Sequence, residues 1–233
     1  MRRSRGVSAV LAVIVAVVGL GLLGSGTAAA ASTLALRSVP VGSWTDGQVF
    51  GAWRVVFAGY GSVTSTRNSM TLAPMASTAP GETHAALVVS QSNFSATKLS
   101  VTAKMTTTSQ LRTGSAANPW EVGWLVWDYV DNEHFTYAIA KPNGWELGKR
   151  DPAYPGGQRF LATGSSVTVP VGTQATYNVT RTVQTNGTTL TVLKIQGVTV
   201  AKFTDTERPY TGGAVGVYTE DARIVVNALS ANG

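Results

Sequence analysis

The stretch WDYVDNEHFTYAIAKPNGWELGKRD, from Trp127 to Asp151, decides the fold class of this chain. Its short runs of β-branched and aromatic residues are separated by turn residues, which is typical of antiparallel strands. Asn143-Gly144 matches the preference of two-residue hairpin turns, and Asp131-Asn132 is predicted to form a second turn. The stretch therefore predicts three consecutive antiparallel strands joined by two hairpins.

The two turns set a register, and the register assigns side chains to faces. It pairs Lys141 with Glu146 and Trp127 with Thr136. One face is then expected to be the core, with Val122, Trp124, Val126, Phe135, Tyr137 and Ile139. The other face has small residues at its centre and is expected to form a shallow trough that binds sugars by aromatic stacking, with Glu121, Trp127, Tyr129, His134, Trp145 and Lys149. A slip of one residue in either turn would exchange the two faces.

The rest of the chain continues the same strand-and-turn pattern. Asn186-Gly187 predicts a further hairpin between 180–185 and 188–195. Further strands are expected at 83–90, 98–107, 122–130, 134–141, 145–150, 166–169, 176–182, 214–218 and 223–229. No linker or internal repeat divides residues 32–233, so we expect one domain, an antiparallel sandwich or barrel.

The first 31 residues are expected to be a secretory signal peptide. Three arginines precede an uncharged run from Val7 to Gly24, and small residues end in Ala28-Ala29-Ala30-Ala31. This is the layout of a cleavable leader, with an uncleaved membrane anchor as the alternative. No second apolar run of that length follows. We therefore expect a secreted chain that has no membrane segment after cleavage.

The composition excludes several kinds of site. There is no cysteine, which rules out disulfides, thiol catalysis and thiolate metal sites. Removing the three leader arginines from the 18 basic residues leaves 15 against 12 acidic residues. The remaining basic residues form no cluster in the sequence, so we do not expect nucleic acid as a partner.

Two long segments resemble a known superfamily. EVGWLVWDYVDNEHFTYAIAKPNGWELGKRD and GTQATYNVTRTVQTNGTTLTVLKIQGVTVAKFTDTERPYTGGAVGVYTEDARIVVNAL together resemble the concanavalin A-like jelly-roll β-sandwiches. The chain is most similar to secreted bacterial domains related to laminin G modules and to the 3-keto-disaccharide hydrolase domain. The resemblance covers roughly residues 45 to 229.

This resemblance implies a fold that serves many functions, among them lectins, carbohydrate-binding modules, glycosidases, lyases and adhesion modules. Many members hold a structural calcium ion. In this chain Asn227 stands where the family usually has Asp, so the site would lose one charge, which Asp46 could replace. Calcium is thus a possible cofactor with no assigned ligands.

The sequence favours a secreted glycan-binding module as the function. Asp151 to Phe160, DPAYPGGQRF, is expected to be a rigid loop beside the trough. The candidate ligand contacts are Trp127, Tyr129, His134, Trp145, Lys149, Asp151, Tyr154 and Arg159.

Two other classes remain open. One is a glycosidase or polysaccharide lyase on the same face, with Glu121, His134, Lys149 and Asp151 as candidate catalytic groups. No strand carries the Glu-x-Asp-x-Glu pattern of laminarinase-type hydrolases, and the catalytic residues are left unassigned. The other class is a structural or adhesion module without a small ligand.

Overall fold

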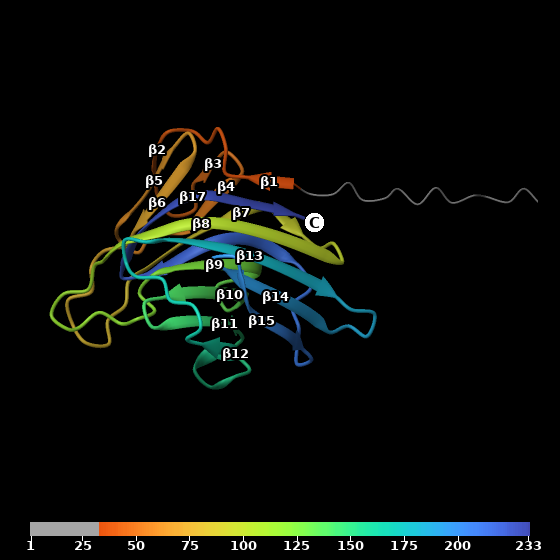
Figure 1. Ribbon diagram of the computed structural model, residues 1–233. Helices are drawn as coiled ribbons and strands as arrows, with labels where there is room; N and C mark the ends of the chain where they lie inside the picture. Colours follow the sequence, from red (N-terminus) through yellow and green to blue (C-terminus); the bar gives the residue numbers. More distant parts are fainter. Residues whose placement is uncertain (1–32) are drawn as a thin grey trace, which may run out of the picture. The chain divides into compact units, whose positions relative to one another are not determined.

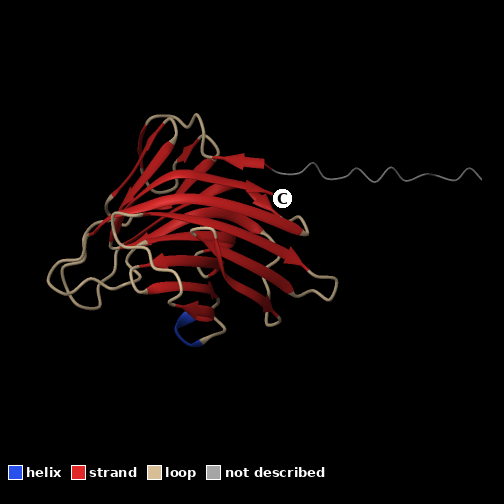
Figure 2. Ribbon diagram, viewed as in Figure 1, coloured by secondary structure: helices blue, strands red, loops and turns tan. Residues whose placement is uncertain are grey.

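Alternating apolar and polar residues build two antiparallel β-sheets that pack face to face in the computed structural model, which describes residues 33–233 (Figure 1). Within residues 33–233, helix is limited to a short 3-10 turn, η1 (Pro155–Gly157) (Figure 2). No helix of the described residues is long and apolar enough to cross a membrane. The predicted all-β jelly-roll sandwich is confirmed. The predicted signal peptide, residues 1–31, lies outside the described residues.

The first sheet has nine strands. In spatial order it contains β15 (Val198–Asp205), β14 (Thr189–Ile195), β13 (Gln174–Val183), β8 (Lys98–Gln110), β17 (Ala222–Asn232), β6 (Ser69–Ala73), β5 (Ser62–Thr66) and β2 (Gly42–Trp44), while β1 (Thr33–Ala35) pairs with β17. All of its strand pairs are antiparallel.

The second sheet has eight strands. In spatial order it contains β12 (Gln158–Gly164), β11 (Gly144–Arg150), β10 (His134–Lys141), β9 (Gly123–Asp131), β16 (Gly213–Glu220), β7 (Ala85–Phe94), β4 (Trp53–Phe57) and β3 (Val49–Phe50). The quoted stretch supplies its strands β9, β10 and β11.

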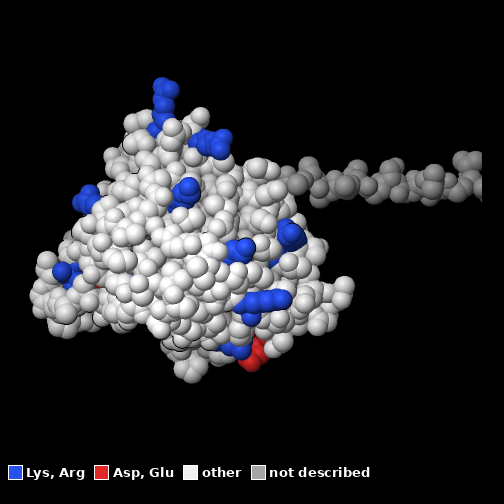
Figure 3. Space-filling model, viewed as in Figure 1, with Lys and Arg blue, Asp and Glu red and all other residues white. Residues whose placement is uncertain are grey.

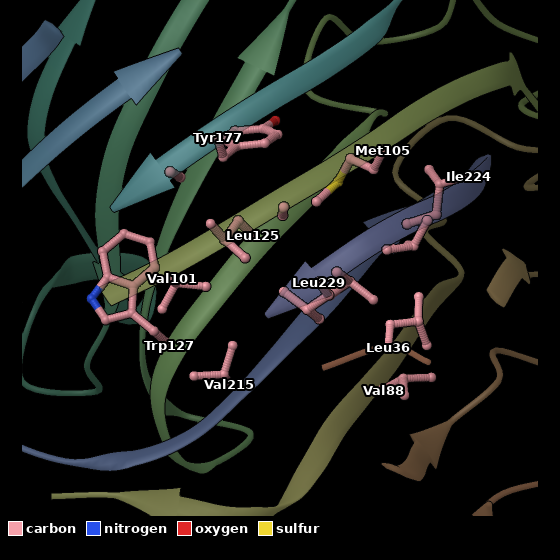
Figure 4. Packing of buried hydrophobic residues seen from close by; sticks show 14 of the residues in the cluster. Leu36, Val88, Val101, Met105, Leu125, Trp127, Tyr177, Val215, Ile224 and Leu229 are labelled. Carbon is pink, nitrogen blue, oxygen red and sulfur yellow. The ribbon is translucent and has the colours of Figure 1, made fainter. Parts of the chain in front are cut away.

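The main core lies between the two sheets. On β8 every second residue is buried, so that Leu99, Val101 and Met105 point inward while polar residues point outward. They face Leu125 and Trp127 of β9 in one continuous apolar cluster (Figure 4). Burial of one such large apolar side chain stabilises the fold by about 1.5–3 kcal/mol.

The sheets approach closely around Tyr177 of β13. Its hydroxyl accepts a hydrogen bond from the Ala140 backbone N–H at 2.8 Å and donates one to the Gly123 carbonyl at 3.1 Å. A Cβ atom at Gly123 would lie 2.6 Å from the sulfur of Met105. The small residues on this face of β9 and β10 therefore admit Tyr177 and Met105 from the opposite sheet.

The second sheet is apolar on both of its faces. Val126, Tyr137 and Ile139 are fully buried, yet they belong to a second cluster on the side away from the nine-stranded sheet. Strands β9 and β10 thus lie between two apolar layers. This explains why they read as almost continuous apolar runs.

The hairpin between β10 and β11 differs from the prediction by two residues. Lys141 pairs with Gly144, so the loop is Pro142-Asn143, and Glu146 lies opposite Ile139. A shift of two residues keeps every side chain on its predicted face. Lys141 and Glu146 still form an ion pair, now on a diagonal across the two strands.

The hairpin between β9 and β10 contains a bulge. Trp127 pairs with Thr136 as predicted, but Asp131 pairs with His134, and the register shifts in between. Asp128 has φ +50°, in the left-handed region. The bulge moves Tyr129 to the opposite face from Trp127, so their predicted common face is wrong.

Apart from Tyr129, the buried residues of the two predicted sets lie on separate faces, but the roles of the two faces are exchanged. The expected trough face, with Trp127, Trp145 and Leu147, is the core between the sheets. The expected core face, with Trp124 and Phe135, points away from the other sheet. The nine-stranded sheet packs on the face of β9 and β10 that carries the small residues, because small side chains let the two sheets approach closely.

The predicted set of strands also differs from the structure. Residues 166–169, expected as a strand, are irregular, and the strand of this region is β12, just before them. Strands β1 to β6, β12 and β15 were not predicted. The turn at Asn186-Gly187 is confirmed as a hairpin between β13 and β14, with Gly187 at φ +82°.

A buried ion pair between Arg181 and Asp128 lies at the bulge. Arg181 of β13 donates from Nη2 to Asp128 Oδ1 at 2.9 Å and from Nε to Oδ2 at 3.2 Å, and both side chains are 1 % exposed. Arg181 also donates to the carbonyls of Ala96 and Phe94. Every charge at this point is therefore matched by a partner from another strand.

We expect Arg181→Ala to lower the free energy of unfolding by about 3–5 kcal/mol, because it leaves Asp128 buried without its cation. The double variant Arg181→Met/Asp128→Asn should recover part of this loss. Urea denaturation of the two variants and of the exposed control Arg37→Ala measures the effect. A loss for Arg181→Ala no larger than that of the control would contradict the structural role of the pair.

Candidate functional site

The predicted ligand contacts do not lie together. Trp127 is 0 % exposed and Trp145 is 5 % exposed, and both pack in the core between the sheets. Neither ring can stack on a ligand. Their assignment as ligand contacts was wrong, because it depended on the trough face being open.

Tyr129 and His134 lie near the β9–β10 turn. The Tyr129 hydroxyl donates to Asn132 Oδ1 at 2.8 Å. His134 Nδ1 lies 2.8 Å from Asp131 Oδ1, and its ring packs edge-on against Tyr210. Both side chains thus support the turn and its surroundings, and they lie apart from Trp127.

Four predicted contacts do come together, around the end of β15. Lys149 donates from Nζ to Asp205 Oδ2 at 2.7 Å and to the Arg208 carbonyl at 3.1 Å. Arg159 Nη1 lies 3.1 Å from Asp205 Oδ1, and its Nη2 lies 3.0 Å from Glu207 Oε1. The acidic partners come from the nine-stranded sheet and its following loop.

The other two members complete this ionic cluster. Arg208 Nε donates to Asp151 Oδ2 at 3.0 Å, and the Tyr154 hydroxyl donates to Glu207 Oε2 at 3.0 Å. Hydrogen bonds from Ala153 and Arg208 lower the pKa of the Asp151 carboxyl, although burial opposes the shift. These ionised groups bind one another and join the edges of the two sheets. The predicted proximity was right, and the predicted role as a ligand site finds no support here.

The candidate catalytic set is likewise dispersed. Glu121 is fully buried and pairs with Arg112 at 2.6 Å. Arg112 also binds Asp221 at 2.8 Å. Lys149 and Asp151 belong to the ionic cluster described above, and His134 lies at a turn. These residues do not face one cavity.

A groove that the sequence reasoning missed lies on the outer face of the eight-stranded sheet. A cavity of about 260 Å³ forms its first part and is lined by Phe57, Leu87, Trp124, Asn132, Phe135, Arg150, Gln158, Tyr218 and Glu220. A cavity of about 390 Å³ forms its second part and is lined by Pro119, Trp120, Trp124, Lys141, Asn143, Glu146, Gln158, Phe160 and Glu220. Trp124, Gln158 and Glu220 line both parts, and we call the whole the outer groove.

Aromatic rings form the floor of the outer groove. The Trp124 ring lies 4.9 Å from that of Tyr218 and 4.8 Å from that of Tyr137, centroid to centroid. Phe135 packs against Tyr218 at 6.4 Å. In the second part, Trp120 and Phe160 remain 42 % and 58 % exposed. The groove therefore combines a fixed aromatic floor with two open rings.

Polar groups surround this floor. The Arg150 guanidinium bonds only the Gly156 carbonyl, at 3.2 Å, and forms no ion pair among the described residues. Gln158 donates to the Tyr137 hydroxyl, and burial raises the pKa of that phenol. Lys141 and Glu146 form an ion pair at the far end. The groove thus offers donors and acceptors at both ends.

Glu220 is the least satisfied charge in the groove. It accepts a hydrogen bond from the Tyr218 hydroxyl at 2.6 Å but has no Lys, Arg or His partner within ion-pair distance in the described part of the chain. Burial raises the pKa of this carboxyl, and the hydrogen bond from Tyr218 opposes the shift. A carboxylate held in this way is a strong acceptor for ligand hydroxyl groups.

A calcium site does not follow from the residues that the resemblance suggested. Asn227 Oδ1 accepts a hydrogen bond from Gln174, and Asp46 Oδ1 accepts one from the Ala58 N–H at 2.7 Å. Residues 33–233 contain no group of three or more His, Asp or Glu side chains arranged to hold a metal ion. The donor set of Asn227 and Asp46 therefore does not fit calcium.

The groove geometry suits a sugar ligand. Sugar rings present apolar C–H faces that stack on aromatic side chains, and their hydroxyl groups pair with side chains such as Arg, Gln and Glu. Alternation along the strands would have located most of the floor, because Trp124, Phe135 and Tyr137 were placed on one face. The alternation did not reveal that this face is the one open to solvent.

Comparison with known proteins supports the fold. No protein-family model matches the chain, and no curated protein matches it. Among solved structures, it is similar to the carbohydrate-binding module CBM66 from Bacillus subtilis, with 13 % identity, 76 % of this chain and 92 % of that chain covered, and a TM-score of 0.53.

Two further solved structures share the architecture. The metal-free carbohydrate recognition domain of Emp46p has 10 % identity, covers 77 % of this chain and 87 % of its own, and has a TM-score of 0.52. The lumenal domain of VIP36, with Ca²⁺ and Man3GlcNAc bound, has 10 % identity, covers 77 % and 83 %, and has a TM-score of 0.50. The chain therefore has the lectin-like β-sandwich fold of these domains.

Proposed function

We propose that this protein binds a glycan in the outer groove. The observation that carries the proposal is the combination of an aromatic floor with an unpaired, half-buried carboxylate, Glu220, in one groove. A buried carboxylate without a cation destabilises the fold. Its presence in a cavity lined by aromatic residues is therefore better explained by ligand binding than by folding.

The open rings strengthen this proposal. Trp120 and Phe160 lie at the second part of the groove, where they add apolar surface without contributing to the buried floor. Exposed apolar surface that is rimmed by polar residues marks ligand-binding grooves. The two parts of the groove together suit a ligand longer than one sugar ring.

The similar structures point in the same direction. They are described as a carbohydrate-binding module, a carbohydrate recognition domain and a domain with a bound oligosaccharide. Their low identity supports only the fold, so the glycan itself is argued from the groove. Residues 1–31, with their signal-peptide layout, support an extracellular glycan as the ligand. The similarity to laminin G-related domains belongs to the same proposal.

A screen of residues 32–233 against plant, fungal and bacterial polysaccharides tests the proposal. It should score both retention of the polymer and release of reducing ends, because Glu146 and Glu220 line the same cavity. We expect retention without cleavage, unchanged by a calcium chelator. Release of reducing ends would instead assign a glycosidase to the groove, and no retention at all would favour an adhesion module.

We expect Trp120→Ala/Phe160→Ala to weaken glycan binding about tenfold, since each lost stacking contact is worth about 0.5–1.5 kcal/mol. The melting temperature should stay close to that of the wild type, because both rings are exposed. Isothermal titration with the retained polysaccharide measures the affinity.

The matched control for this variant is Tyr60→Asn. Tyr60 is an exposed aromatic residue outside the groove, and Asn tolerates its positive φ of 59°. The control should bind the glycan as the wild type does. Equal binding by the double variant and the control would show that the open rings do not contact the ligand.

We expect Glu220→Gln to be more stable than the wild type at neutral pH and weaker in glycan binding. The raised pKa means that folding favours the protonated carboxyl, so this contribution to stability is present below the ordinary pKa of 4.5 and is lost as pH rises through the raised value. Glutamine carries no charge, so the variant does not lose this stability as pH rises. The difference in the free energy of unfolding between variant and wild type should vanish in acid. The lost charge-assisted acceptor should reduce affinity about tenfold.

Thermal unfolding and isothermal titration between about pH 4 and pH 8 measure both effects. Tyr218→Phe is the companion variant, because it removes the hydrogen bond to Glu220 and keeps the ring of the floor. If Glu220→Gln binds the glycan as tightly as the wild type at neutral pH, Glu220 has no part in recognition.

A further inference from the structure

The outer face of the nine-stranded sheet is basic. Lys98 and Lys104 on β8, Lys194 on β14, Lys202 on β15 and Arg223 on β17 all point outward and are exposed. Arg37 and Arg67 lie exposed in the connections beside them. Figure 3 shows basic side chains spread over this side of the molecule, with acidic atoms only near its lower edge.

None of these seven basic residues has an acidic partner in the described part of the chain. The ion pairs of residues 33–233 involve other lysines and arginines. The outward positions of β8, β13, β14, β15 and β17 carry no Asp or Glu. The face therefore presents positive charges that nothing in the described chain neutralises.

The acidic residues of the described chain lie away from this face. Five of the twelve in the sequence are buried in ion pairs or networks elsewhere, namely Glu121, Asp128, Asp151, Asp205 and Asp221. The others lie in loops and turns or in the outer groove. A nearly balanced sequence thus folds into a protein with one basic face.

Hydroxyl and amide side chains fill the spaces between these charges. Lys194 lies opposite Asn178, which lies opposite Thr102, and Asn178 Nδ2 donates to the Thr102 hydroxyl at 3.0 Å. Lys202 faces Val192, beside Thr180 and Ser100 in the same row. From the spacing of strands and residues, the Cα atoms of Lys104 and Lys202 each lie roughly 8–12 Å from that of Lys194.

We propose that this face binds an acidic polysaccharide. Lysines spaced across a sheet match a polymer with repeated carboxylate groups, and the hydroxyl and amide side chains between them match its sugar hydroxyls. The outward positions of β8, β13, β14, β15 and β17 carry no aromatic residue. The stacking platform for nucleic-acid bases and the inserting side chains for a lipid surface are therefore missing there.

This second surface is separate from the outer groove. The groove lies on the outer face of the eight-stranded sheet, and the basic face lies on the outer face of the other sheet, with the main core between them. A chain with both sites would hold two different polysaccharides at once, one by stacking and one by charge.

The test measures binding of residues 32–233 to polygalacturonate, with pullulan as the uncharged polymer, at about 0.1 M salt, where the screening length is about 10 Å. We expect Lys104→Gln/Lys194→Gln/Lys202→Gln to bind polygalacturonate about tenfold more weakly than the wild type. Binding by the wild type should also weaken as salt rises. The groove variant Trp120→Ala/Phe160→Ala should bind polygalacturonate as the wild type does.

The control has the same change in net charge at another place. Ser115→Glu/Ala116→Glu/Ala117→Glu adds three acidic groups to an exposed loop before β9 and should keep the affinity within about twofold. An equal loss in this control, or wild-type affinity in the lysine variant, would overturn the proposal. Tighter binding to duplex DNA or to anionic phospholipid vesicles would overturn the choice of polysaccharide. Loss of polygalacturonate binding in the groove variant would place that polymer in the groove.

Discussion

The contact of Tyr177 with the small residues of β9 and β10 controls how the two sheets meet. Its hydroxyl is buried and needs both of its partners, the Ala140 N–H and the Gly123 carbonyl. These hydrogen bonds set the distance between the sheets and also their lateral alignment. A Cβ atom at Gly123 would lie 2.6 Å from the Met105 sulfur, so the Met105 side chain would have to move away from β9. Small residues that looked like the floor of a ligand trough are therefore the condition for a close-packed core.

The outer groove is a consequence of that packing. Trp124, Phe135 and Tyr137 of β9 and β10 point to the other side of the eight-stranded sheet, where no further sheet of the described chain covers them. Trp124, Phe135 and Tyr218 cover one another there, and a rim of polar side chains borders the apolar surface. Arg150 and Glu220 in that rim are not paired within the described chain. The architecture that buries one face of β9 and β10 thus leaves the other available for a ligand.

Local alternation predicted which side chains share a face, but not which face is inside. Trp127 and Thr136 pair as expected, and the two-residue shift at Pro142-Asn143 keeps the face of every residue. Since both faces are apolar, the choice depends on Tyr177, about forty positions away from these strands, which a local pattern does not reveal. The bulge at Asp128 is similar, because its partner Arg181 also comes from the other sheet. Fold class follows from local pattern, whereas the site depends on contacts distant in sequence.

The surface charge follows from the same long-range pairing. Asp128 and Asp205 are used inside the molecule to bind Arg181 and Lys149, which join β13 to the bulge and β15 to β11. These acids are neutralised by their own cations, and the outward positions of β8, β13, β14, β15 and β17 carry no acidic residue, so exposed lysines such as Lys104 have no counter-charge there. Reading the sequence alone, the basic residues looked scattered and the excess small. Folding places charges of opposite sign apart. Acidic residues are buried in ion pairs with Arg or Lys, while lysines without an acidic partner in the described chain point outward from alternate positions of the strands. The stability of the sandwich and the field of its outer face therefore arise from one distribution of acidic residues.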